Sequence, residues 1–179
     1  TQVFAGTGSF NSDVAAFFRK WLLDAADSQA ENGAYPDVVP DSVAVSKGSA
    51  AWADAGIIVP YIMYRKYGDI WLIRRNFSSM EKYMQFIIAR NGPLECYGDW
   101  LAYEGTDQRI IVRAYYAYDL KLMSIMAGAI GENAKAESYA AKYEEVKNAY
   151  IDDYILSGYG IISDTQTGCV VTLMADLVP

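Results

Sequence analysis

Apolar residues recur at helical spacing through most of this chain, and that periodicity restricts the fold more than any other feature of the sequence. Positions three and four residues apart lie on one side of an α-helix, so each such segment has a face to bury. The pattern predicts helices over residues 12–29, about 52–67, 70–90, 108–130, 133–154, and from Thr165 or Thr167 to about 177. No alternating apolar and polar run is long enough to predict a sheet. We therefore expect an all-α protein of about six helices.

Residues with known positional preferences mark the expected helix ends. Asn11, Ser12 and Asp13 are placed to cap the first helix, and Asn133 is placed to cap the helix that follows it. Pro60 lies inside the second periodic segment and predicts a kink or a local irregularity there.

The breaks between helices alternate between short turns and long loops. Gly68 and Gly131 each end a helix and leave only a turn before the next one. Residues 31–51 and 94–107 are long loops, and prolines and a glycine in the first of them forbid a continuous helix. Helical hairpins in series thus carry plain turns at one end and elaborate loops at the other, where functional residues tend to gather. Periodicity leaves a solenoid, a bundle and a toroid of inner and outer helices all open.

The charge and the hydropathy of the chain exclude two classes of partner. Lys and Arg number 15 against 22 Asp and Glu, so a net charge of -7 provides no positive field for a nucleic-acid backbone. The apolar stretch from Ala55 to Met63 is interrupted by Gly56 and Pro60 and is far shorter than the ~20 residues of a membrane span. We expect neither a nucleic acid nor a membrane as partner.

The absence of histidine restricts the chemistry further. It removes the commonest general base, the commonest metal ligand and every Ser–His or Cys–His nucleophile pair. Carboxylates must then supply any acid–base chemistry, and we expect no metal and no cofactor. Cys96 and Cys169 lack CxxC spacing and are interpreted as buried free thiols. No signal segment opens the chain, which leaves a cytoplasmic and an exported location both open.

Two clusters of tryptophan and aspartate lie in the long loops, Trp52 with Asp54 and Asp99 with Trp100. An indole face packs on the apolar C–H face of a pyranose, while a carboxylate accepts hydrogen bonds from sugar hydroxyls. The alternative interpretation makes both tryptophans core anchors and both aspartates helix caps, and the residues alone slightly favour it. Gln166 is open to either a ligand contact or a helix cap.

The same segments, taken in order, resemble the catalytic domain of glycoside hydrolase family 78, the bacterial α-L-rhamnosidases. The resemblance extends over nearly the whole chain, and the order and spacing of the segments are specific although no single one is. The segments are TQVF at 1–4, FFRKWL at 17–22, NGAYPDVVP at 32–40, WADA at 52–55, YRKYGD at 64–69, GDWL at 98–101 and TQT at 165–167.

This resemblance implies an (α/α)6 barrel of six helical hairpins, of which the chain supplies about the middle three. Residues 1–179 would then be a partial catalytic domain, incomplete at both ends. It also implies an inverting mechanism, in which one carboxylic acid protonates the leaving oxygen and a second carboxylate activates water. The family's acid and base glutamates lie outside the matching segments, so we expect no catalytic residue in this chain. Trp52 and Trp100 carry over as walls of the rhamnose pocket, with Asp54 and Asp99 as neighbouring polar support.

The favoured hypothesis is a fragment of an inverting α-L-rhamnosidase that removes terminal α-L-rhamnose from glycans or glycosides. The alternatives are a non-catalytic carbohydrate-binding helical module, an (α/α)6 hydrolase for another sugar, and a helical scaffold for protein partners. A binding module should hold its whole site within one chain, whereas this chain matches only an internal part of the family's pattern. A scaffold should repeat with a fixed period, and this sequence shows no internal repeat. We expect a carbohydrate partner, and exposed edges that cause dimerisation or aggregation unless the rest of the barrel is present.

Overall fold

The chain folds into helices joined by turns and two long loops. The structure, a computed structural model, describes residues 1–42, 46–95, 97–99, 101–156, 160–162 and 164–179. Within these residues seven helices form, which confirms the all-α class. They are α1 (Gln2–Asn11), α2 (Ala15–Asp27), α3 (Ala55–Tyr67), α4 (Ile70–Arg90), α5 (Gln108–Ile130), α6 (Asn133–Tyr154) and α7 (Gln166–Met174).

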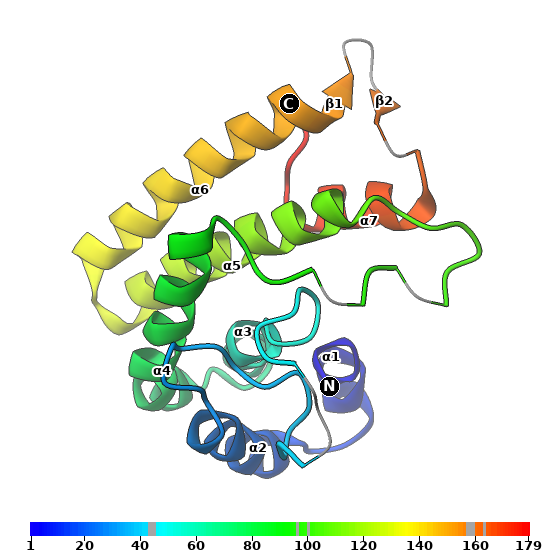
Figure 1. The fold of residues 1–179 in the computed structure, drawn as a ribbon. Coiled ribbons are helices and arrows are strands. Elements are labelled where there is room, and N and C mark those ends of the chain that lie inside the picture. Colours follow the sequence, from blue (N-terminus) through cyan, green and yellow to red (C-terminus); the bar gives the residue numbers. More distant parts are fainter. Residues whose placement is uncertain (43–45, 96, 100, 157–159, 163) are drawn as a thin grey trace.

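The helices form two rows, an arrangement visible in Figure 1. In the first row α1 packs on α3, α3 on α5, and α5 on α7, so every second helix along the chain is a neighbour in space. In the second row α2 covers α3 and α4, α4 covers α3 and α5, and α6 covers α5. Inner and outer helices that alternate in this way are the arrangement of an α/α toroid. The six-hairpin architecture expected from the resemblance accounts for it.

The interior between the rows consists of large apolar side chains from facing helices. Ile57 of α3, Tyr83 and Met84 of α4, and Tyr116 and Met123 of α5 are completely buried. A second cluster joins α1, α2 and α3 through Ala5, Phe18, Leu22, Val59, Met63 and Leu72. The two clusters share partly buried Trp21 and Ile62 at their edges, so the core is continuous from the first helices to α7.

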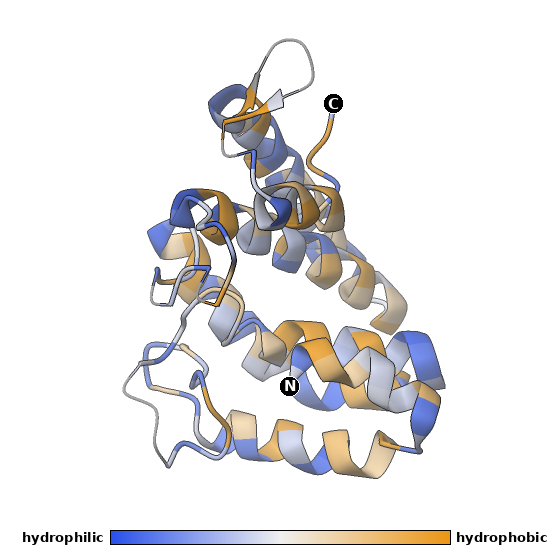
Figure 2. Cartoon of the chain, turned by 90° about the vertical axis from the view of Figure 1, so that its right-hand side faces the viewer, coloured by the Kyte–Doolittle hydropathy of each residue, from blue (hydrophilic) through white to orange (hydrophobic). Residues whose placement is uncertain are grey.

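The long loops lie together at one end of the helices, on the left in Figure 2. The backbone N–H of Leu94 donates to the Gly48 carbonyl at 2.7 Å, and the Ala50 N–H donates to the Leu94 carbonyl at 2.9 Å. At the other end Gly68 and Gly131 adopt left-handed φ values of 66° and 88° and end α3 and α5, as predicted. The expected contrast between a loop end and a turn end is confirmed.

The prediction of one helix over residues 12–29 was wrong at its start. Residues 2–11 form a separate helix α1, and Ser12 leaves it with extended dihedrals of φ -154° and ψ 157°. Helix α2 then begins at Ala15, whose N–H donates to the Asp13 carboxylate at 3.1 Å. Phe10 of α1 is 78% exposed, so it does not continue the buried face of α2. The chain bends at Ser12 between the two helices, and apolar spacing alone does not locate such a bend.

Smaller differences concern the remaining boundaries. Trp52 lies in a turn before α3, and α3 continues through Pro60. Glu132, not Asn133, is the N-cap of α6, and α7 ends at Met174. Residues Ile155–Leu156 (β1) and Gly160–Ile161 (β2) pair as a short antiparallel hairpin that the sequence did not predict.

Cys169 is a partly buried free thiol, and Cys96 lies outside the described residues. In the part of the chain that the structure describes, no helix has the length and apolar character needed to span a bilayer.

Candidate sugar site at the loop end

Trp52 and Tyr97 form an aromatic pair that joins the two long loops. Their ring centroids lie 4.7 Å apart with an angle of 41° between the ring planes. Both side chains are partly buried, so the pair is held by protein on some sides and open on others. An aromatic surface of this kind suits the apolar face of a sugar ring.

A hollow of about 360 Å³ lies beside Trp52. Its lining is contributed by the start of the chain, by α2, by the first long loop and by the first residue of α3: Thr1, Gln2, Val3, Trp21, Pro36, Asp37, Val38, Val39, Ala51, Trp52 and Ala55. Trp21 and Asp37 were not predicted as site residues. The sequence did contain a signal for both, because each lies in one of the segments that carry the family resemblance.

Asp37 is nine-tenths buried and holds the two arms of the first long loop together. Its carboxylate accepts hydrogen bonds from the Ser49 N–H at 3.0 Å and from the Ser49 hydroxyl at 2.6 Å. Asp37 thus shapes the loop that forms one side of the Trp52 hollow.

Asp54 is completely buried beneath the Trp52 turn. Its Oδ1 accepts from the Tyr83 hydroxyl at 2.6 Å, and its Oδ2 accepts from the Ala51 N–H at 2.6 Å. Asp54 does not line the hollow, and it reaches the Trp52 turn through the neighbouring backbone. Its assignment as polar support for a sugar pocket stays a prediction.

A second buried carboxyl group, Asp119 of α5, is the hydrogen-bond partner of Asp54. Burial raises the pKa of Asp119 well above its usual value, and the neighbouring Asp54 charge raises it further. Burial also raises the pKa of Asp54, while hydrogen bonds from Asp119, Tyr83 and Ala51 oppose that rise. Because both groups are closed to solvent, this pair does not meet a substrate as acid and base.

Asp99 connects the second long loop to the start of α7. Its Oδ2 accepts from the Thr106 hydroxyl at 2.7 Å, and its Oδ1 accepts from the Thr167 hydroxyl at 3.1 Å. Thr106 also bonds Thr165, the N-cap of α7, whose hydroxyl accepts from the Gly168 N–H. Trp100, the other predicted wall of the pocket, lies outside the described residues.

Asp99 lines a second hollow of about 400 Å³, together with Leu101, Ala102, Tyr103, Glu104, Gln166 and Thr167. This hollow shares no lining residue with the hollow beside Trp52. Trp52 and Asp99 therefore line different hollows of the loop end. Gln166 and Glu104 are exposed there, so both can offer polar groups to a ligand.

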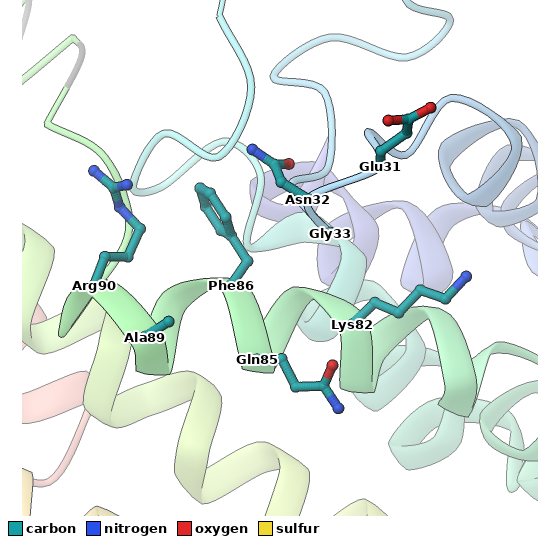
Figure 3. Close-up of a pocket in the computed structure, with 8 residues that line it drawn as sticks. All are labelled: Glu31, Asn32, Gly33, Lys82, Gln85, Phe86, Ala89 and Arg90. Atoms are coloured by element: carbon teal, nitrogen blue, oxygen red, sulfur yellow. The ribbon is translucent and has the colours of Figure 1, made fainter.

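A larger hollow of about 690 Å³ lies between the first long loop and α4 (Figure 3). Figure 3 shows Phe86 and Arg90 at one end and Glu31 and Lys82 at the other, while Gln85 points away from the ring of Phe86. The Arg90 guanidinium lies 5.2 Å from the Phe86 ring centroid. The polar groups of this hollow do not converge on one point, so it lacks the arrangement that fixes a small ligand.

The described residues contain no group of three or more histidine, cysteine, aspartate or glutamate side chains placed to hold a metal ion. What the loop end offers chemically is aromatic surface, carboxylates that shape the loops, and exposed polar side chains beside two hollows.

The two helix rows and the loop end together define a hairpin-built α/α protein of the six-hairpin glycosidase type. The sequence-family model of the bacterial alpha-L-rhamnosidase six-hairpin glycosidase domain matches residues 1–179. The chain therefore belongs to that family.

Individual relatives agree with this assignment. An alpha-L-rhamnosidase of Streptomyces avermitilis is 32% identical over 99% of this chain, and one of Formosa agariphila is 29% identical over 99%. The crystal structure of the Streptomyces avermitilis alpha-L-rhamnosidase complexed with L-rhamnose matches with a TM-score of 0.94, and a structure of the alpha-L-rhamnosidase from Dictyoglumus thermophilum matches with a TM-score of 0.90 at 27% identity. The chain covers 18% and 20% of the two curated relatives, and 18% and 21% of the two solved chains.

Proposed function

We propose that this chain forms part of the catalytic barrel of an α-L-rhamnosidase and supplies one wall of the pocket for a terminal α-L-rhamnosyl group. In this proposal residues 1–179 make up about half of the (α/α)6 barrel. Trp52, Trp100, Asp54 and Asp99 carry the contribution of the chain to the pocket and its support. The acid and base carboxyl groups come from outside the chain.

The observation that supports the proposal most directly is the Trp52–Tyr97 aromatic pair, of which Trp52 lines the hollow. Trp52 and Tyr97 come from different loops, with ring centroids 4.7 Å apart, beside a hollow of about 360 Å³. The backbone here follows that of a relative whose structure was determined with L-rhamnose, at a TM-score of 0.94. A hollow with an aromatic wall and a few polar groups is typical of sites that bind the two unlike sides of a sugar.

The test uses two samples: the 179-residue chain, and a longer protein that carries the chain with the flanking parts of the barrel. We expect the longer protein to hydrolyse an aryl α-L-rhamnoside and the 179-residue chain to show no turnover. Each missing acid or base typically removes roughly 10² to 10⁴ of rate. Turnover by a sequence-verified 179-residue sample, proportional to its concentration, would contradict our placement of the catalytic groups.

A matched pair of tryptophan variants tests the pocket itself. Trp52→Ala in the longer protein should weaken L-rhamnose binding about tenfold, since stacking on an aromatic ring contributes roughly 1 kcal/mol or more. Trp71→Ala is the control, because Trp71 is 54% exposed on α4 and its ring lies 5.0 Å from the Arg75 guanidinium. Equal losses of affinity in the two variants, measured by titration calorimetry, would remove Trp52 from the pocket.

A further inference from the structure

Asp119 is a buried carboxyl group that the proposed function does not use. It lies in the middle of α5, and its side chain has no exposure to solvent. Among the described residues no hydroxyl, amide or cation donates to either of its oxygens. Among these described residues its hydrogen-bond partner is the Asp54 carboxyl group. A buried ionised carboxylate without donors is strongly unfavourable, so this pair must hold a proton.

The hydrogen bonds around Asp54 place that proton on Asp119. Both oxygens of Asp54 already accept hydrogen bonds, from the Tyr83 hydroxyl and from the Ala51 N–H, each at 2.6 Å. Asp54 is thus solvated by donors as an ionised carboxylate, whereas Asp119 has no such donor in the described part of the chain. A neutral Asp119 becomes a donor itself and gives Asp54 a third hydrogen bond.

The hydrogen bond from Ala51 transmits this arrangement to the pocket wall. Ala51 adopts a left-handed φ of 65°, which is unfavourable for a residue with a Cβ and persists only where the surroundings hold it. The Asp54 carboxylate accepts a hydrogen bond from the Ala51 N–H, and the Gln2 side chain donates to the Ala51 carbonyl. Trp52 is the next residue, so the backbone of Ala51 sets the direction in which the indole ring leaves the turn.

We propose that Asp119 is a positioning residue of the sugar pocket: its neutral carboxyl group donates to Asp54, Asp54 holds Ala51 in its left-handed conformation, and Trp52 is thereby fixed against Tyr97. That Trp52 forms a wall of a sugar pocket rests on the function proposed above. The positions of Ala51, Trp52 and Tyr97 do not depend on that function and are measured separately.

Three variants of the longer protein test the proposal. Asp119→Asn keeps the shape and a donor toward Asp54, Asp119→Leu keeps the approximate size but removes the donor, and Asn76→Leu is the control. Asn76 is a buried polar residue of α4 whose side chain, among the described residues, donates to the Leu72 carbonyl of its own helix. The control therefore makes the same polar-to-apolar exchange outside the Asp54 network.

Crystal structures and kinetics give the first two readouts. We expect Asp119→Asn and Asn76→Leu to retain the left-handed Ala51 and the Trp52–Tyr97 distance, with KM for an aryl rhamnoside within about twofold of the unsubstituted protein. Asp119→Leu should release Ala51, separate the rings and raise KM about tenfold with a smaller change in kcat, as expected for loss of one charged hydrogen bond. An unchanged ring pair in Asp119→Leu, or a displaced one in Asp119→Asn, would overturn the proposal.

Infrared spectroscopy gives a readout that needs neither activity nor the leucine variant. Tyr83, Tyr115 and Tyr118 interact electrostatically with the pair, and the Asp37 carboxyl group acts on Asp54 from the first long loop. The unsubstituted protein should show the C=O band of a protonated carboxylic acid at neutral pH, and Asp119→Asn should lack it. Absence of the band overturns the proposal even if Asp119→Leu does not fold. Failure of the protein to bind L-rhamnose would remove the proposed function and leave the ring geometry and this band to decide the role of Asp119.

Discussion

At the scale of single residues, Asp99 has the most consequential contacts outside the Trp52 hollow. It accepts hydrogen bonds from Thr106 and Thr167, and so connects the second long loop to the first turn of α7. Local sequence order gives no reason for this contact, since Thr167 lies 68 positions further along the chain. The Asp99 carboxylate and the Thr106–Thr165 hydrogen bond together hold the start of α7 against that loop.

We predict that Asp99→Ala loosens the start of α7. Hydrogen bonds to a charged group contribute roughly 1.5 to 3 kcal/mol each, so exchange of the Gly168 and Cys169 amide protons should accelerate at least about tenfold. Asp153→Ala is the control, because Asp153 is exposed on α6 and takes no part in the hydrogen bonds described here for Thr106, Thr165 and Thr167. Unchanged protection of α7 in Asp99→Ala, measured by hydrogen–deuterium exchange, would show that other contacts hold the helix.

At the scale of secondary-structure elements, the first long loop is seated on α3 through a glycine. An added Cβ at Gly56 would lie 2.2 Å from the ring of Tyr35, far inside van der Waals contact. Tyr35 is buried, and its hydroxyl makes a 2.6 Å hydrogen bond with Ser79 of α4. The absence of a side chain at Gly56 thus allows the loop to pack between two helices.

Gly56→Ala and Gly128→Ala form a matched pair that tests this packing. Gly56→Ala must displace Tyr35 and should destabilise the protein by about 1 to 3 kcal/mol. Gly128 lies inside α5 with its nearest neighbour, the Ala136 Cβ, 3.9 Å from an added Cβ, so alanine there should stabilise by about 0.5 to 1 kcal/mol. Denaturant midpoints of the two variants that shift in the same direction would contradict the role assigned to Gly56.

At the scale of the whole molecule, the outermost helices expose apolar side chains. Val3, Phe4 and Phe10 of α1 are 86%, 59% and 78% exposed, and Val170 and Leu173 of α7 are 56% and 65% exposed. Helices α1 and α7 stand at the two ends of the first row, which consists of α1, α3, α5 and α7 (Figure 1). In a complete six-hairpin barrel neighbouring hairpins would continue the row on both sides, and we propose that they cover these faces.

We predict that the 179-residue chain alone dimerises or aggregates. Each 100 Å² of apolar surface left uncovered forfeits roughly 2.5 kcal/mol of burial, against a typical domain stability of about 5 to 15 kcal/mol. Sedimentation of a sequence-verified sample checks this expectation, with the longer protein as control. A soluble monomer that unfolds cooperatively on heating would show that residues 1–179 are a self-sufficient domain.

The sequence by itself determined the helical class, the ends of the longest helices and the contrast between loop end and turn end. Residues 70–90 and 108–130 were predicted with the bounds that α4 and α5 have. These features are local: apolar spacing selects the helix, and a residue able to adopt a left-handed φ ends it. The family resemblance could also be recognised from the sequence alone, because it rests on short segments in a fixed order.

Only the tertiary structure decided how the loop end is assembled. It brought Trp21 and Asp37 to the Trp52 hollow, and it placed Asp54 on Tyr83, 29 positions away, instead of in the hollow. It also added helix α1 over Gln2–Asn11, ahead of the helix predicted over residues 12–29, which as α2 runs from Ala15 to Asp27. Apolar spacing predicts which face of a helix is buried. Which distant residues cover that face depends on how the helices pack, and a single sequence contains no local signal for that packing.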